Sequence, residues 1–320
     1  MSVTVSLFRA LFAFQDVLHP VTPAACRPDP AALGVTLGPD DAYCEMDDGV
    51  RLFYRAWVPD QPRQVIACFH GMGAYGGHFR VIGERLRPQG IAVYVFDLRG
   101  HGLSDGLRGD FAHMERFIVD LDGVAVFLQN RYPDLPCFLL GESLAASIVL
   151  KYASENPMRL AGIVLAAIEV KPSVFPKAVE VLRYLPYVLW NSRASVIEMG
   201  ERERLVSRDP AHFPRAQRDP LRTEQFSVRS IVETHALIQE WPQSARRISV
   251  PCLILQGGAD LLTDPKGARG LLDAITYPEK DLAFFPDAYH GLFYDPDTPM
   301  VLDELARWLA GRLSSSSKRR

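Results

Sequence analysis

Three residue types that together can perform nucleophilic catalysis occur in this sequence in the order serine, aspartate, histidine. Ser143 lies in the segment GESLAAS, Asp260 in GGAD and His290 in AYHG. A serine hydroxyl is a weak nucleophile until a base removes its proton, which is the task predicted for His290. Asp260 would orient the imidazole and stabilise it when charged. The three residues therefore predict attack on an acyl carbonyl through an acyl-enzyme intermediate.

The segment around Ser143 differs at one position from the nucleophile-elbow pattern G-x-S-x-G. Gly141 is retained, but the last glycine is replaced by Ala145. In such an elbow the serine itself adopts the unusual backbone angles, and the glycines allow the strand and the helix to approach closely. Because alanine adds only one methyl group, we expect a functional elbow with slightly altered packing. The alternative is a degenerate, inactive fold.

A glycine-rich loop, HGMGAYG at residues 70–76, offers backbone donors to the oxyanion that forms during such an attack. The N–H groups of Met72 and Leu144 are the natural candidates. The same loop also fits the dinucleotide-binding pattern G-x-G-x-x-G, followed by Asp97 at the end of the next expected strand. A dehydrogenase would not need the elbow, the late acid or the late histidine. We therefore favour an oxyanion loop and expect no cofactor.

Other titratable residues compete for the roles of base and acid. The rivals are His70, His101 and His113 for the base, and Glu169 and Asp264 for the acid. His70 is the strongest of these because it lies in the oxyanion loop, whereas Asp97 is expected only to brace its own loop. His70 and His78 lack nearby carboxylates in the sequence, so we expect no metal site.

Short apolar runs alternate with amphipathic segments over most of the chain. The expected strands are 51–58, 65–69, 91–96, 137–140, 161–167, 253–256 and 282–285, and the expected helices are 79–86, 114–131, 144–152 and 301–313. This alternation predicts an α/β fold with a mostly parallel central sheet flanked by helices on both faces. Ser143, Asp260 and His290 would each follow the carboxyl end of a strand and so meet at one edge of the sheet.

The alternation stops near residue 170 and resumes near residue 251. The segment 171–249 is too long for a plain connection, so we expect a helical cap, inserted between late strands, with a helix at 228–239. Its aromatic residues suit an acyl chain, and the predicted substrate-binding residues are Phe175, Tyr184, Tyr187 and Trp190. The alternative is that they only pack the cap on the core. The predicted domains are 1–40 (N-terminal helix and connector), 41–170 with 250–320 (core), and 171–249 (cap).

The composition excludes several classes of protein. The 320 residues include 35 basic and 38 acidic ones, and this balance argues against a nucleic acid partner. The five cysteines show no C-x-x-C spacing, which favours a reducing compartment, and we expect a cytoplasmic location.

The first twenty residues lack a basic start and contain Arg9, so they predict an amphipathic helix rather than a cleaved signal. This helix is expected to pack on the domain; resting on a membrane surface is the alternative.

Taken together, the motifs resemble the monoacylglycerol lipase and lysophospholipase branch of the α/β-hydrolases, a group of serine aminopeptidase S33-type enzymes. The matching segments are DGVRLFYRAWVP, HGMGAYGGHF, FDLRGHGLSDG, GESLAAS, ILQGGADLLTDPKGA and AYHGLF. The likeness extends from residue 46 to the end, is weakest in the cap, and is absent from the first forty residues.

The resemblance implies an ester hydrolase with a lipid-accepting cap, which acts on small lipid esters. We expect no cofactor, and peripheral membrane contact through the cap or the N-terminal helix is an alternative that the sequence leaves open. The family's triad falls on Ser143, Asp260 and His290, and its oxyanion donors fall on Met72 and Leu144. The chain departs where the family shows S-M-G-G. The alternatives are a small-ester or thioester hydrolase, a non-catalytic binding protein of the same fold, and a nucleotide-dependent oxidoreductase.

Overall fold

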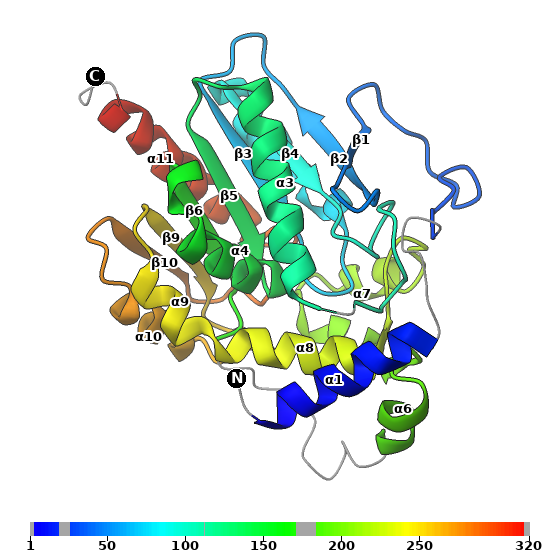
Figure 1. The fold of residues 1–320 in the computed structure, drawn as a ribbon. Helices are drawn as coiled ribbons and strands as arrows, with labels where there is room; N and C mark the ends of the chain where they lie inside the picture. The colour runs from blue at the N-terminus through cyan, green and yellow to red at the C-terminus, as the bar shows by residue number, and fades with distance from the viewer. Residues whose placement is uncertain (1–2, 19–25, 112, 171–183, 317–320) are drawn as a thin grey trace.

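A computed structural model describes residues 3–18, 26–111, 113–170 and 184–316, and a central sheet of eight strands dominates it (Figure 1). In sheet order the strands are β1 (Ala42–Glu45), β2 (Arg51–Trp57), β4 (Ile91–Phe96), β3 (Gln64–Phe69), β5 (Cys137–Glu142), β6 (Gly162–Ala166), β9 (Cys252–Gly257) and β10 (Lys280–Phe285). The pairs β1–β2 and β2–β4 are antiparallel, and the other five pairs are parallel. The predicted mostly parallel sheet is confirmed.

Helices cover both faces of this sheet, as the sequence predicts. One face carries α3 (Glu115–Arg131), α4 (Leu144–Glu155), α9 (Trp241–Arg247) and α10 (Lys266–Ala274), and the other carries α2 (Arg80–Leu86) and α11 (Thr298–Ser316). Strand β3 contributes side chains to the hydrophobic clusters on both faces of the sheet. Val65 and Phe69 belong to the cluster under α3 and α4, and Ile66 and Cys68 belong to the cluster under α2 and α11. Successive side chains of a strand point to opposite faces, so a strand covered on both sides is apolar throughout.

The segment between β6 and β9 is not wholly helical, which corrects the sequence prediction. It contains α6 (Leu185–Trp190), β7 (Ser195–Glu198), the 3-10 helix η5 (Gly200–Leu205), α7 (His212–Ala216), β8 (Gln225–Ser227) and α8 (Val228–Gln239). Strands β7 and β8 form a small antiparallel sheet of their own. Strands this short show too few alternations to be recognised from hydrophobic periodicity. The helix expected at 228–239 is α8.

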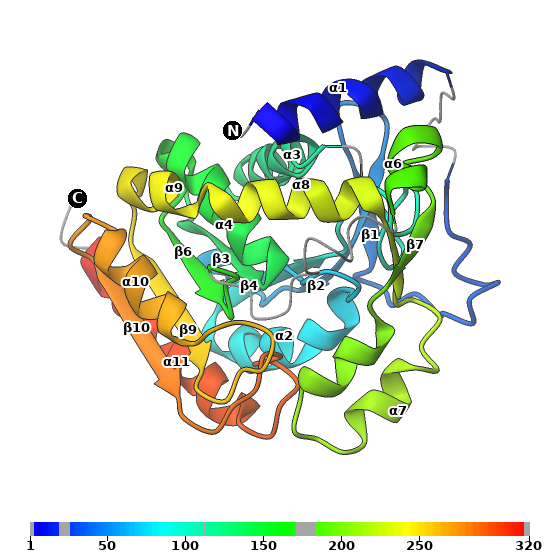
Figure 2. The same cartoon turned by 90° about the horizontal axis from the view of Figure 1, so that it is seen from below.

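The N-terminal helix α1 (Val3–Leu18) lies along α8 and beside α6, as both views show (Figures 1 and 2). Phe12 of α1 is fully buried there, and Arg9 pairs with Glu233 of α8. The helix therefore packs on the inserted segment rather than on the sheet. None of the helices in the described ranges is long and apolar enough to cross a bilayer.

Candidate active site

Ser143 occupies a sharp turn between β5 and α4. Its backbone has φ 55° and ψ −119°, so the serine itself lies in the left-handed region, as the sequence analysis expects. Gly141 lies where the strand meets the helix, and a Cβ atom there would overlap the backbone carbonyl of Ala145. Of the two elbow glycine positions, Gly141 is thus the one at which any side chain would collide.

The methyl group of Ala145 is part of the hydrophobic core, since Ala145 is fully buried in the cluster formed by α3, α4 and the sheet. Replacing Ala145 with glycine is expected to leave kcat/KM within about tenfold of the wild type, a change below about 1.4 kcal/mol. The free energy of unfolding should fall by about 0.5–1 kcal/mol, because glycine is costly in a helix. Steady-state kinetics and denaturant unfolding measure both effects. A gain of activity above tenfold would show that the methyl group distorts the elbow.

Ser143, His290 and Asp260 form a continuous hydrogen-bonded chain. Nε2 of His290 lies 2.8 Å from Oγ of Ser143, and Nδ1 lies 2.8 Å from Oδ2 of Asp260. Oδ1 of Asp260 accepts the backbone N–H groups of Leu262 and Thr263 at 2.8 and 2.9 Å. A carboxylate at Nδ1 requires the proton on that nitrogen, which leaves Nε2 to accept the serine proton.

The electrostatics of the three residues favour an ionised pair. Burial opposes the charge on Asp260, but the imidazole of His290 and the bonds from Thr263 hold the pKa of Asp260 below its usual range. Burial also opposes the charge on His290, but the carboxylates of Asp260, Glu169 and Glu142 raise the pKa of His290 to about 9. The neutral imidazole, the form that could act as a base, is therefore most abundant in the alkaline range.

Two further carboxyl groups line the site. Glu142 is buried next to the serine, and burial raises its pKa to about 8. The hydroxyl of Tyr294 donates to Oε2 of Glu142 at 3.4 Å. Glu169, the rival acid, lies beside Ser143, whose hydroxyl donates to its Oε1 at 3.5 Å, so it does not take the place of Asp260 behind His290. Sequence reasoning missed Glu142, although its position between Gly141 and the serine could have identified it.

The pH dependence of activity should reflect these carboxylates. Because the pKa of His290 is raised, kcat/KM is expected to fall on acidification from a pH well above 6.5, the ordinary pKa of histidine. Replacing Glu169 with glutamine removes a negative charge that favours the protonated ring, so the acidic limb should move to lower pH. The measurement is kcat/KM from about pH 5 to 10 for both proteins. If the acidic limb of the pH profile stayed in place or moved to higher pH in the variant, Glu169 would not be raising the pKa of His290.

The glycine-rich loop that begins at His70 lies directly against Ser143. A Cβ atom on Gly71 would come within 2.9 Å of Cβ of Ser143, so only glycine allows this approach. Among the described residues, neither the N–H of Met72 nor that of Leu144 donates to a protein acceptor. Both groups thus have the free hydrogen-bonding capacity that the sequence prediction requires of them.

The rival residues brace the surrounding loops. His70 is buried with both ring nitrogens engaged: Nδ1 with the carbonyl of Gly71 at 2.8 Å, and Nε2 as acceptor of the Leu98 N–H at 3.0 Å. Asp97 accepts the N–H groups of Gly76 at 2.6 Å and Leu103 at 2.8 Å. The glycine-rich loop and its aspartate therefore hold each other in place.

The remaining rivals also lie away from the reacting atoms. His101 is buried, with Nδ1 3.0 Å from the carbonyl oxygen of Arg99. Asp264 accepts the N–H of Lys266 at 3.0 Å, at the start of α10.

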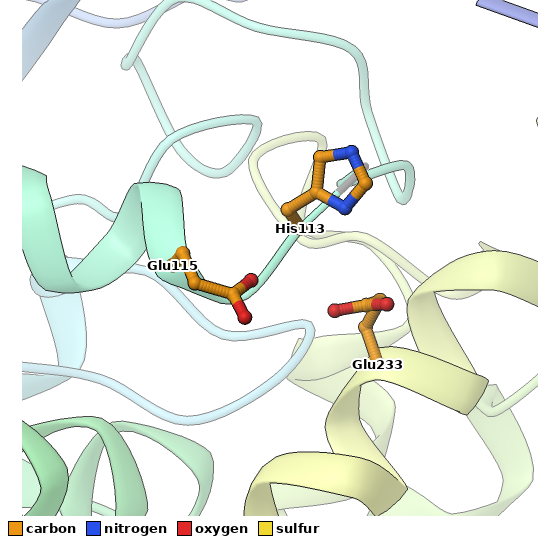
Figure 3. A group of neighbouring side chains, drawn as sticks. All are labelled: His113, Glu115 and Glu233. Carbon is orange, nitrogen blue, oxygen red and sulfur yellow. The ribbon is translucent and has the colours of Figure 1, made fainter. Parts of the chain in front are cut away.

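His113, the last rival base, belongs to a separate cluster with Glu115 and Glu233, whose ligand-type atoms lie within 4.8 Å of one another. Figure 3 shows the three side chains converging from the start of α3, the loop before it, and α8. Arg9 supplies the positive charge at this place: its guanidinium binds Glu233 at 2.7 and 2.6 Å and Glu115 at 2.8 Å. Arg9 of α1 thus pairs with both carboxylates and offsets one of their two negative charges, and these contacts join α1, α3 and α8.

A pocket lined by Ser143 lies between the sheet edge and the inserted segment. Its apolar lining from the insertion consists of Ile197, Met199, Val206, Ala216, Phe226 and Ile231. The predicted substrate-binding aromatics are not among the described lining residues: Tyr184 packs near Phe12, and Tyr187 and Trp190 are exposed. Phe175 lies outside the described residues. The aromatic residue types alone did not reveal which part of the insertion faces the serine.

Comparison with known proteins agrees with this geometry. The model of the family described as serine aminopeptidase, S33, matches residues 60–297. The chain is 29% identical to the monoacylglycerol lipase of Mycolicibacterium smegmatis over 272 residues, which cover 83% of this chain and 95% of that protein. It is 30% identical to the monoglyceride lipase of Rattus norvegicus over 279 residues, with coverage of 85% and 91%.

Among solved structures, the monoacylglycerol lipase of Paleococcus ferrophilus superposes with a TM-score of 0.73 at 27% identity, covering 82% of this chain and 99% of that one. The family resemblance seen in the motifs is thereby confirmed. The chain belongs to the serine aminopeptidase S33 family, and it is an α/β-hydrolase of the lipase and esterase type.

Proposed function

We propose that the protein hydrolyses monoacylglycerols or related single-chain esters by way of an acyl-enzyme on Ser143. The observation that carries the proposal is the chain of 2.8 Å contacts from Ser143 through His290 to Asp260, beside a pocket that Ser143 and His290 line and that has an apolar wall. The relatives named as monoacylglycerol or monoglyceride lipases, which this chain matches over most of its length, give it further support.

In the proposed mechanism, Oγ of Ser143 attacks the ester carbonyl while Nε2 of His290 accepts its proton. The charged ring stays bound through Nδ1–H to Asp260. The N–H groups of Met72 and Leu144 bind the oxyanion, and each such donor is worth about 3 kcal/mol. His290 then gives its proton to the departing alcohol, and a water molecule repeats the sequence on the acyl-enzyme to release the fatty acid.

The pocket offers both surfaces that such a substrate needs. The apolar side chains of the insertion would remove an acyl chain from water. The ion pair of Glu203 with Arg222 lines the same pocket and suits a polar alcohol. These features favour a substrate with one acyl chain and a small polar head.

The test is hydrolysis of p-nitrophenyl esters from acetate to palmitate, together with monoacylglycerol itself. We expect turnover of monoacylglycerol and an optimum beyond acetate. An optimum at acetate would favour the small-ester alternative. A folded protein that cleaves neither set would leave a non-catalytic binding protein as the better account.

We further propose peripheral membrane contact through α6. Its Tyr187, Leu189 and Trp190 expose 39%, 46% and 74% of their surface, which is unusual for large apolar residues on one short helix. Trp190→Ser should weaken co-sedimentation with phospholipid vesicles, whereas Val119→Ser, at an exposed valine of α3, should not. Equal binding by both variants would argue against a role for α6.

For location, we propose the cytoplasm. The five cysteines are free thiols and four of them are buried, which suits a reducing compartment. Cell fractionation followed by immunodetection checks this; recovery with exported proteins would contradict it.

A further inference from the structure

The apolar wall of the pocket is shared with a cluster built around the N-terminal helix. Ile197, Met199 and Ile231 line the pocket that contains Ser143. The same three residues pack in the cluster that includes Phe12 of α1. Phe12 is fully buried in this cluster. These three side chains therefore belong both to the pocket wall and to the cluster in which α1 packs.

Polar contacts along α1 fix the position of Phe12 behind this wall. Ahead of it, Arg9 binds Glu233 through two hydrogen bonds. After it, Oε1 of Gln15 accepts the backbone N–H of Ser192 at 3.0 Å and its hydroxyl at 2.6 Å. Because these contacts lie on both sides of Phe12 along one helix, they set the register in which its ring meets the wall.

Further contacts near the end of α1 reinforce this register. Asp16 pairs with Arg193 and with Arg229, the latter at 2.7 Å. Arg229 lies in α8, the helix that also supplies Ile231 to the wall. The helix α1 and the wall of the pocket are thus held by the same element.

The helix α1 lies outside the part of the chain that the family model matches, residues 60–297. The wall residues Ile197, Met199 and Ile231 lie inside it. In this chain, α1, which lies outside the family match, therefore packs in one cluster with wall residues that lie inside the match.

We propose that Phe12 limits the depth of the acyl pocket and so determines the longest acyl chain that is cleaved efficiently. This inference rests on the proposed ester hydrolysis. An acyl chain that reaches Ile197 and Met199 can extend further only by pushing them toward Phe12, and a well-packed cluster resists such overpacking. The thioether chain of Met199 is the most adaptable part of the wall. Without the ring of Phe12, Met199 and Ile197 would have space into which to move.

The test compares Phe12→Ala with Phe14→Ala, the same change two residues later on the same helix at a side chain that is 60% exposed. The substrates are p-nitrophenyl butyrate, octanoate, dodecanoate and palmitate. We expect Phe12→Ala to raise the ratio of kcat/KM for the longest ester to that for butyrate by about tenfold, a typical effect of one methylene group in an apolar pocket. Phe14→Ala should leave this ratio unchanged. Phe12→Leu, which keeps an apolar side chain, should shift the ratio in the same direction by less.

The outcomes distinguish this inference from the proposed function. If the wild type cleaves butyrate and folded Phe12→Ala has the same chain-length ratio as Phe14→Ala, the role of Phe12 is refuted while the esterase proposal stands. If Phe12→Ala does not fold, Phe12→Leu decides by the same ratio. If the wild type cleaves no ester, the proposed function fails. Calorimetric binding of fatty acids of eight to eighteen carbons to the same variants then decides whether Phe12 limits chain length.

Discussion

Replacing Ser143 with alanine is expected to lower kcat for ester hydrolysis by about 10⁶-fold, the loss typical of removing the nucleophile of a serine hydrolase. The change removes only the hydroxyl group, and Nε2 of His290 contacts the oxygen of this group, Oγ, at 2.8 Å. The backbone at position 143 has φ 55°, and alanine and serine carry the same Cβ atom, so the strain of the turn is little altered. The folded state should therefore survive the change.

Ser147 provides a matched control for this experiment. It lies one turn further along α4, is buried like Ser143, and its hydroxyl has no hydrogen-bond partner among the described residues. Ser147→Ala should keep wild-type activity, because it removes a buried hydroxyl that forms no bond. A fluorophosphonate probe should label the wild type and Ser147→Ala, but not Ser143→Ala. Labelling of Ser143→Ala at comparable rate would show that another residue is the nucleophile.

The residues proposed to perform the chemistry could be singled out because each follows a strand that the sequence predicts. Ser143 directly follows β5, and Asp260 follows the end of β9 after two further residues. Both strands are buried on both faces, and such strands appear in the sequence as largely apolar runs. Since parallel strands end at one edge of the sheet, chain order alone was enough to bring these side chains together with His290. No detail of side-chain packing was needed for that step.

The pocket could not be predicted in the same way. Its apolar wall comes from β7, the loop after it and α8, where Ile197, Met199 and Ile231 converge only after the insertion has folded. The sequence pattern of α8 shows that one face is buried, but not whether the buried face meets the core, α1 or a substrate. Exposed Trp190 illustrates the consequence: its size made it a candidate for the acyl chain, yet its place on α6 leads it to the surface.

Replacing Asp260 with asparagine is expected to lower kcat by about 10⁴-fold, the effect known for the buried aspartate of such triads. The contacts of Asp260 indicate how this loss of kcat would arise. Its Oδ1 accepts two backbone N–H groups, from Leu262 and Thr263, so the amide oxygen of an asparagine must take that position. The amide nitrogen then occupies the position of Oδ2 and donates toward Nδ1 of His290. Nδ1 can accept this bond only when the ring proton is on Nε2, and in that tautomer His290 cannot take the proton of Ser143.

Asp264 supplies the matched control for Asp260, because it lies in the same loop and its Oδ1 accepts the N–H of Lys266 at 3.0 Å. Asp264→Asn should keep kcat within about tenfold of the wild type, since an amide oxygen can accept the same bond. The pH profile separates a positioning role from a loss of folding. The carboxylate of Asp260 raises the pKa of His290, so its removal should move the remaining acidic limb of Asp260→Asn to lower pH. If Asp260→Asn and Asp264→Asn lost kcat equally, and neither change moved the acidic limb of the pH profile, Asp260 would not orient the base.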